Sequence, residues 1–179
     1  MSVQLIYETH SFTVDNELGI ATGWLPGELS AAGRRLAAEL GQRRTDVDLV
    51  VSSDLRRAVE TVEVAFAGSA IPRHEDRRLR ECNYGELNGA PVASLGPRGQ
   101  YVDQPFPGGQ SYRDVVDQTR EFLADVSDRY DGSTVLLVSH SANRWALQNL
   151  LDGTPLEELV DAPFDWQPGW TYELPAGWS

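Results

Sequence analysis

The sequence predicts a three-layer α/β/α sandwich with a mainly parallel sheet, and two observations lead to this fold class. Short apolar runs at residues 3–8, 48–51 and 134–139 are typical of strands that are buried on both faces. They alternate with longer segments of helical periodicity, which is the pattern of strand–helix–strand units. With 179 residues, the chain is expected to form one domain over 1–179.

Capping residues predict where the helices begin. Ser30 is expected to start a helix that ends near residue 42, and Ser53 or Asp54 is expected to start a second one. Ser111 predicts a third helix to about residue 130, and a fourth is expected over 141–151. A short edge strand is expected over 70–74, and a final strand, antiparallel at an edge, over 166–174.

Two stretches rich in glycine and proline, 17–29 and about 85–110, are expected to be loops. A structureless stretch as long as the second one is generally a functional cover or a flexible insert. We therefore expect a loop-rich, substrate-covering insertion at about 85–110.

Composition excludes several classes of protein. The net charge of −12 argues against a general binder of nucleic acid or of anionic membranes. No apolar run approaches the roughly 20 residues that span a bilayer, and no signal segment is visible, so a cytoplasmic protein is expected. Cys82 is the single cysteine, and no Cys/His spacing resembles a metal site. All 15 basic residues are arginines, so any phosphate site must use arginine, histidine and backbone amides.

Two of the three histidines stand where predicted buried strands end. His10 follows the first strand, and His140 follows the strand over 134–139. Open α/β sheets bind ligands at the carboxyl ends of their strands. The pattern therefore predicts that two adjacent parallel strands present both imidazoles to one crevice.

Four motifs in a fixed order make the chain resemble the histidine phosphatase superfamily, with its phosphoglycerate mutase-like fold. They are His10 with Thr13 and Asn16; Ser52-Ser53-Asp54-Leu55 with Arg57, Ala58 and Thr61; Leu79-Arg80-Glu81 with Tyr84 and Gly85; and Val138-Ser139-His140. The resemblance covers nearly the whole chain, including Thr22-Gly23-Trp24 after the first motif.

The resemblance implies a phosphomonoesterase of the histidine acid phosphatase type that needs no metal or cofactor. His10 would be the nucleophile, because a neutral imidazole attacks phosphorus and the resulting phosphohistidine is labile. Arg57 would clamp the phosphate, while Asn16 and a protonated His140 would donate hydrogen bonds. Glu81 would be the general acid and then the general base, with its pKa raised beside the phosphate dianion.

The first motif departs from the family, because Thr9 stands where Arg-His-Gly places an arginine, and Glu8 adds a negative charge nearby. Losing a charged donor from a phosphate site costs roughly 3–5 kcal/mol. The enzyme is therefore weakened, inactive or compensated. Arg144, one helical turn after His140, is the candidate replacement, ahead of Arg56 and Arg80.

Several alternatives stay open at this level. Asn16 could be a turn residue, Glu81 could be a surface carboxylate paired with a neighbouring arginine, and Thr22 and Tyr84 could be loop packing rather than substrate contacts. A non-catalytic member that binds a phosphorylated ligand or a protein competes with the hydrolase. A phosphoglycerate mutase ranks low, because the chain has no lysine to bind that substrate.

The expected partner is a small phosphorylated substrate, whose identity the sequence does not fix. Trp24, Tyr101 and Phe106 favour an apolar or planar leaving group. The residues do not fix an oligomeric state, and the resemblance leaves open a homodimer formed through an edge strand.

Overall fold

The computed structural model describes residues 1–179 and is built around a five-stranded sheet with the order β4-β3-β6-β1-β7. The strands are β1 (Ser2–Thr9), β3 (Leu49–Ser52), β4 (Arg73–Glu75), β6 (Thr134–Ser139) and β7 (Trp170–Pro175). The first four run parallel, and β7 lies antiparallel to β1 at the edge. The predicted fold class is confirmed.

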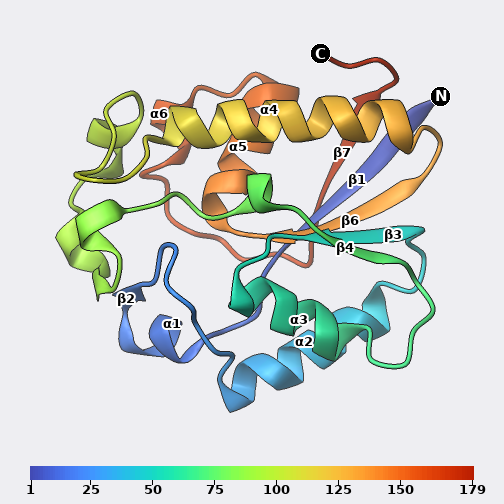
Figure 1. Cartoon of the computed structure of the whole chain (residues 1–179), viewed down its shortest axis with the longest axis horizontal. Coiled ribbons are helices and arrows are strands. Elements are labelled where there is room, and N and C mark those ends of the chain that lie inside the picture. The colour runs from blue at the N-terminus through green and yellow to red at the C-terminus, as the bar shows by residue number, and fades with distance from the viewer.

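Helices cover both faces of the sheet (Figure 1). On one face lie α2 (Ala31–Arg43) and α3 (Arg56–Ala65), and on the other lie α4 (Tyr112–Arg129) and α5 (Ser141–Asp152). Successive strand residues point to opposite faces, so a strand covered on both sides must be apolar throughout. In β1, Leu5 and Tyr7 join the core beneath α4, whereas Ile6 joins the core beneath α2.

The remaining elements are short. They are α1 (Val14–Leu18), α6 (Leu156–Leu159), β2 (Ile20–Ala21), β5 (Ala90–Pro91) and the 3₁₀ helices η1 (Arg77–Leu79), η2 (Gly85–Leu87), η3 (Val92–Leu95) and η4 (Arg98–Tyr101). None of the helices is both long enough and apolar enough to cross a membrane.

The stretch 85–110, expected to be a loop, carries three of these 3₁₀ helices and also β5, which pairs with β2. Its aromatic residues belong to a hydrophobic cluster that is separate from those against the main sheet. Phe106 stacks on Tyr101 at 3.7 Å between ring centroids and meets Tyr84 and Tyr112 edge-on. These contacts fix the insertion against α4 and α5.

The start of α3 differs from the prediction. The N-cap position belongs to Leu55, which has no side-chain cap. The predicted caps are engaged elsewhere, because Ser53 contacts His140 and Asp54 binds Arg80. Tertiary contacts have therefore taken over the side chains that would otherwise cap this helix. The final strand also begins later than expected, at Trp170.

Candidate active site

Two neighbouring strands place the two imidazoles. β1 and β6 pair in a register that sets Thr9 opposite Ser139, so His10 and His140 leave the sheet at the same level. The His10 backbone N–H donates to the Ser139 carbonyl at 2.9 Å. The two rings lie 5.1 Å apart between centroids. The two imidazoles are therefore adjacent at the carboxyl ends of β1 and β6, as predicted, but only His10 lines the cavity described below.

The His10 ring is held by its Nδ1 atom, which lies 2.8 Å from the Ser11 carbonyl oxygen. A carbonyl only accepts hydrogen bonds, so Nδ1 carries the proton and Nε2 keeps its lone pair. Burial, followed by the charge of Arg57, lowers the pKa of His10. The ring is consequently neutral at physiological pH, with Nε2 available as a nucleophile.

The His140 ring is held by the opposite nitrogen. Its Nε2 lies 2.6 Å from Ser53 Oγ, which also accepts the Leu55 backbone N–H. Its Nδ1 is buried without a partner. Burial, with Arg57 and His10 nearby, lowers the pKa of His140, so the free site holds this ring neutral. If Ser53 donates its hydroxyl proton to Nε2, Nδ1–H is left as a hydrogen-bond donor.

Arg57 supplies the fixed positive charge of the site. It lies in the first turn of α3, is buried, and donates to the carbonyl oxygens of Gly23 at 2.8 Å and Leu25 at 3.3 Å. No carboxylate forms an ion pair with it. A buried guanidinium held only by carbonyls keeps its charge available for an anion.

Glu81 is buried and makes no ion pair, which overturns the surface-carboxylate alternative. Its neighbour arginines bind elsewhere: Arg78 pairs with Asp76 and Asp125, and Arg80 pairs with Asp54. Burial raises the pKa of Glu81, although a bond from the Cys82 backbone N–H opposes the shift. A carboxyl group with a raised pKa is suited to donating a proton.

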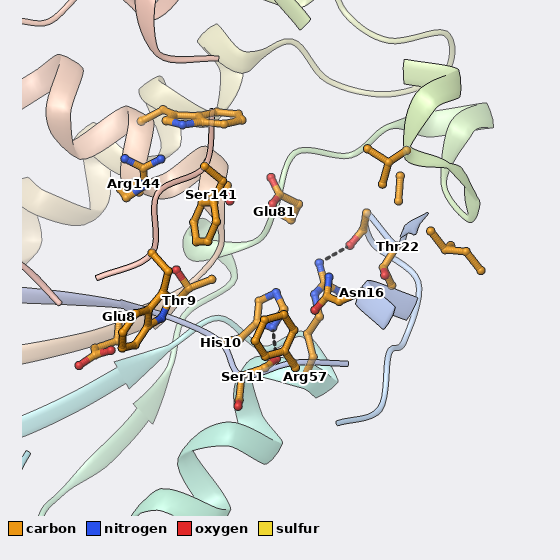
Figure 2. A pocket seen from close by; sticks show the side chains of 18 of the residues that line it. Glu8, Thr9, His10, Ser11, Asn16, Thr22, Arg57, Glu81, Ser141 and Arg144 are labelled. Carbon is orange, nitrogen blue, oxygen red and sulfur yellow. Dashed lines mark hydrogen bonds between the residues drawn. The ribbon is translucent and has the colours of Figure 1, made fainter. Parts of the chain in front are cut away.

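His10, Arg57 and Glu81 line a cavity of about 890 Å³. Figure 2 shows His10, Arg57 and Glu81 around one open space, with Thr9 on one side and Thr22 on the other. His140 is fully buried and does not line this cavity itself. No group of three or more His, Cys, Asp or Glu side chains is placed to hold a metal ion.

Three predicted substrate contacts line the cavity but also have structural partners. Asn16 forms a capping box with Thr13 at the start of α1, so its turn role is real. Thr22 donates to Asp15 at 2.8 Å, and Tyr84 packs edge-on against Phe106. All three side chains are therefore held in place before any ligand binds.

Thr9, which is expected to stand where the family's first motif has an arginine, does not lie beside a free negative charge. Thr9 lines the cavity, and its hydroxyl is 3.4 Å from that of Tyr7. The Glu8 carboxylate is turned away from His10 (Figure 2) and pairs with Arg43 and Arg44, both at 2.9 Å. The expected repulsion by Glu8 is therefore neutralised.

Arg144 lines the same cavity on the side of Thr9 (Figure 2). Its Nη1 donates to Gln148 at 2.9 Å, its guanidinium lies 5.0 Å from the centroid of the Trp170 ring, and its buried Nε has no partner. The other two candidates are occupied, because Arg56 pairs with Glu63 and Arg80 with Asp54.

Sequence reasoning placed Ser53 in a motif and Arg98 in the segment expected to shape the pocket, but it missed the specific role of each. Ser53, read as a helix cap, orients His140, and Arg98 lines the cavity and acts on the pKa of Glu81. The aromatic residues that were expected to receive the leaving group do not line the cavity. Trp24 packs under Arg80, while Tyr101 and Phe106 stack in the core of the insertion.

The site geometry agrees with similarity to known proteins. A sequence model of the histidine phosphatase superfamily (branch 1) matches residues 9–167. The chain is 32% identical over 127 residues to the uncharacterized phosphatase PhoE of Bacillus subtilis, covering 70% of this chain but only 65% of that protein, which is less than two thirds. It is 30% identical over 169 residues to phosphoserine phosphatase 1 of Hydrogenobacter thermophilus, covering 88% of this chain and 80% of the relative.

Other relatives are named phosphoglycerate mutase. Among solved structures, YhfR of Bacillus stearothermophilus superposes with a TM-score of 0.81 at 28% identity, covering 93% of this chain and 88% of that one. The family model spans most of the sequence. This protein belongs to the histidine phosphatase superfamily.

Proposed function

We propose that this protein is a metal-independent phosphomonoester hydrolase that works through a phosphohistidine on His10. One observation carries the proposal: two imidazoles from adjacent strands lie 5.1 Å apart beside a buried guanidinium that has no ion pair. This arrangement offers a nucleophile, a fixed cation and a donor to one phosphoryl group. Phosphatase names among the relatives support the same reaction class.

The reaction has two displacements on phosphorus. His10 Nε2 attacks the phosphorus atom, the ester P–O bond breaks, and Glu81 gives its proton to the departing alkoxide. The Glu81 carboxylate then takes a proton from water, which attacks the phosphohistidine and breaks the P–N bond. Arg57 holds phosphate oxygens in both steps. The His140 ring does not line the cavity of the free protein, and its unpartnered Nδ1–H is proposed to reach a third oxygen only once the phosphate lies against His10.

The roles of Glu81 and His10 can be separated with p-nitrophenyl phosphate. This leaving group needs no proton, so Glu81→Gln is expected to retain the first step and to slow the second, in which water must be activated. A burst of about one nitrophenolate per chain should precede slow turnover. In rapid-quench experiments with a ³²P-labelled substrate, the Glu81→Gln protein should accumulate a covalently bound label that is labile in acid and stable in base.

Controls make this test specific. His10→Ala should show neither burst nor label, whereas His74→Ala, which changes the exposed third histidine, should behave as wild type. A labelled protein in the His10→Ala background would contradict the mechanism.

Arg144 is proposed to supply the guanidinium that Thr9 has removed. Its position on the Thr9 side of the cavity and its unpartnered Nε support this role. Arg144→Leu is expected to weaken inhibition by inorganic phosphate and to lower kcat/KM about a hundredfold. Thr9→Arg in the same chain should restore part of the loss. Arg56→Leu, on an exposed arginine, is the control.

A crystal soaked in tungstate tests the same proposal directly. The Arg144 guanidinium is expected to leave Gln148 and bind the oxyanion. A guanidinium that stays on Gln148, together with an unchanged inhibition constant in Arg144→Leu, would rule the replacement out.

The Thr9 substitution also favours a second candidate, a non-catalytic member that binds a phosphorylated ligand or a protein. The intact set of His10, Arg57, Glu81 and His140 favours the hydrolase instead. No turnover of p-nitrophenyl phosphate by wild type between about pH 5 and about pH 8, with phosphate binding retained, would favour the second candidate.

A further inference from the structure

One wall of the cavity is apolar although it is open to solvent. Nine large apolar side chains of the protein are exposed, and five of them line this single cavity: Phe12, Leu36, Val92, Phe164 and Trp166. Phe164 and Trp166 are 54% and 57% exposed. Apolar groups gathered in one hollow, rather than scattered singly, mark a binding surface.

Four of these exposed lining residues belong to α2 or to other parts of the chain that line the same cavity, and we call them together the α2 wall: Phe12, Leu36, Phe164 and Trp166. Leu36 stands in α2, where Glu39, Leu40 and Arg43 line the cavity from the same helix face, since they follow at intervals of three and four residues. Phe164 and Trp166 come from the segment between α6 and β7. Two parts of the chain that are distant in sequence therefore build one surface.

The segment that carries Phe164 and Trp166 is fastened to α2. The Arg43 guanidinium lies 6.0 Å from the centroid of the Trp166 ring, and Arg44 donates to the Pro168 carbonyl at 2.7 Å. A side chain at Gly169 would place its Cβ 2.2 Å from the Arg44 Nη2 atom, so a glycine lets this approach occur. The α2 wall is thus held in place before a ligand arrives.

The charges around the α2 wall are either paired or negative. Arg43 and Arg44 are both taken by the buried carboxylate of Glu8. Glu39 lines the cavity from α2 itself, whereas Asp161 lies against η4, where it accepts the backbone N–H groups of Arg98 and Gly99. The cavity arginines that form no ion pair, Arg57, Arg98 and Arg144, come from α3, η4 and α5 instead. An anionic leaving group beside α2 would meet the Glu39 carboxylate and arginines that are already paired with Glu8.

We infer that the substrate of this site is a phosphomonoester whose leaving group is uncharged, apolar and flat, and that this group packs on the α2 wall while the phosphate lies at His10. Three aromatic rings in the wall suit a planar partner. The inference rests on the proposed function, because it assigns the half of the substrate that the reaction releases. The α2 wall, rather than Trp24, Tyr101 and Phe106, is then the surface that favours an apolar leaving group.

Binding of stable phosphonates tests the inference without turnover. By calorimetry, (1-naphthyl)methylphosphonate is expected to bind at least about tenfold more tightly than methylphosphonate, because a buried ring system gains that much or more. Leu36→Ser and Phe164→Ser should each remove most of this difference and leave methylphosphonate affinity unchanged. Leu18→Ser is the matched control, since Leu18 is 67% exposed and lies outside the cavity.

Kinetics provide the second readout. The KM for 1-naphthyl phosphate should rise about tenfold in Leu36→Ser and Phe164→Ser, with kcat and the KM for O-phosphoserine unchanged. Equal affinities for the two phosphonates would overturn the inference, even in an active hydrolase. Tighter naphthyl binding without hydrolysis of any ester would overturn the proposed hydrolase and leave the α2 wall as an apolar ligand site.

Discussion

The two imidazoles of the site are held in opposite ways. His10 lines the cavity and is fixed through Nδ1 by a backbone carbonyl, whereas His140 is fixed through Nε2 by the Ser53 hydroxyl and leaves Nδ1 without a partner. A carbonyl dictates one tautomer, while a hydroxyl can donate or accept. One ring therefore keeps a free lone pair on Nε2, and the other can donate a hydrogen bond from Nδ1 while it is neutral.

Replacing each ring in turn should give the largest difference. His10→Asn removes the nucleophile and is expected to lower kcat/KM for p-nitrophenyl phosphate by roughly ten-thousandfold or more. His140→Asn removes one donor to the phosphate and should cost roughly a hundredfold to a thousandfold. Steady-state kinetics of the two variants measure the gap. Equal losses would mean that the two rings do not have separate roles.

A smaller effect is expected from the hydroxyl that orients His140. Ser53→Ala frees the ring to take either tautomer, and we expect kcat to fall about tenfold with KM nearly unchanged. Ser53→Thr should recover most of the activity. Ser127→Ala, at a buried serine that bonds the Ala124 carbonyl, is the matched control. ¹⁵N chemical shifts of the imidazole should report mixed tautomers only in Ser53→Ala; a single unchanged tautomer there would reject the orienting role.

The smallest expected effect concerns stability. The pKa of His140 is lower in the folded protein than its unfolded value of about 6.5, so below that pH the unfolded chain binds a proton that the folded chain does not. Folding stability should therefore fall as pH drops below about 6.5, by at most about 1.4 kcal/mol per pH unit for this ring. The free energy of unfolding, measured with urea, should depend less steeply on pH in His140→Gln than in wild type.

His74→Gln is the control for that measurement, because His74 is exposed at the sheet edge. A slope that is the same in His140→Gln and wild type would show that burial of this ring does not govern acid stability.

The strand-end histidines illustrate what the sequence can predict. The buried runs before His10 and His140 are continuous local signals, and parallel pairing follows from their alternation with helices. Ser53 shows the limit: a serine before a helix has the same local pattern whether it caps the helix or orients an imidazole 87 positions away. Only the folded arrangement decides between the two.

The α2 wall shows the same limit for apolar residues. Leu36 belongs to the apolar stripe of its helix, yet it is 38% exposed and lines the cavity instead of the core. Periodicity identifies which residues share a helix face, but it does not say whether the face is covered. The partner segment around Trp166 lies 130 positions further along the chain, and the strand predicted over 166–174 begins only at Trp170, which leaves Trp166 outside the strand.

The arginines of the cavity have a consequence for how enzyme assays at different pH values should be read. A guanidinium does not lose its proton in proteins, and the chain has no lysine ammonium to titrate in its place. The part of the attraction for a dianion that comes from the cavity arginines is thus constant through the alkaline range. Under the proposed mechanism, a loss of kcat/KM at alkaline pH would therefore reflect deprotonation of Glu81. This loss should be steepest for esters whose alcohols are poor leaving groups.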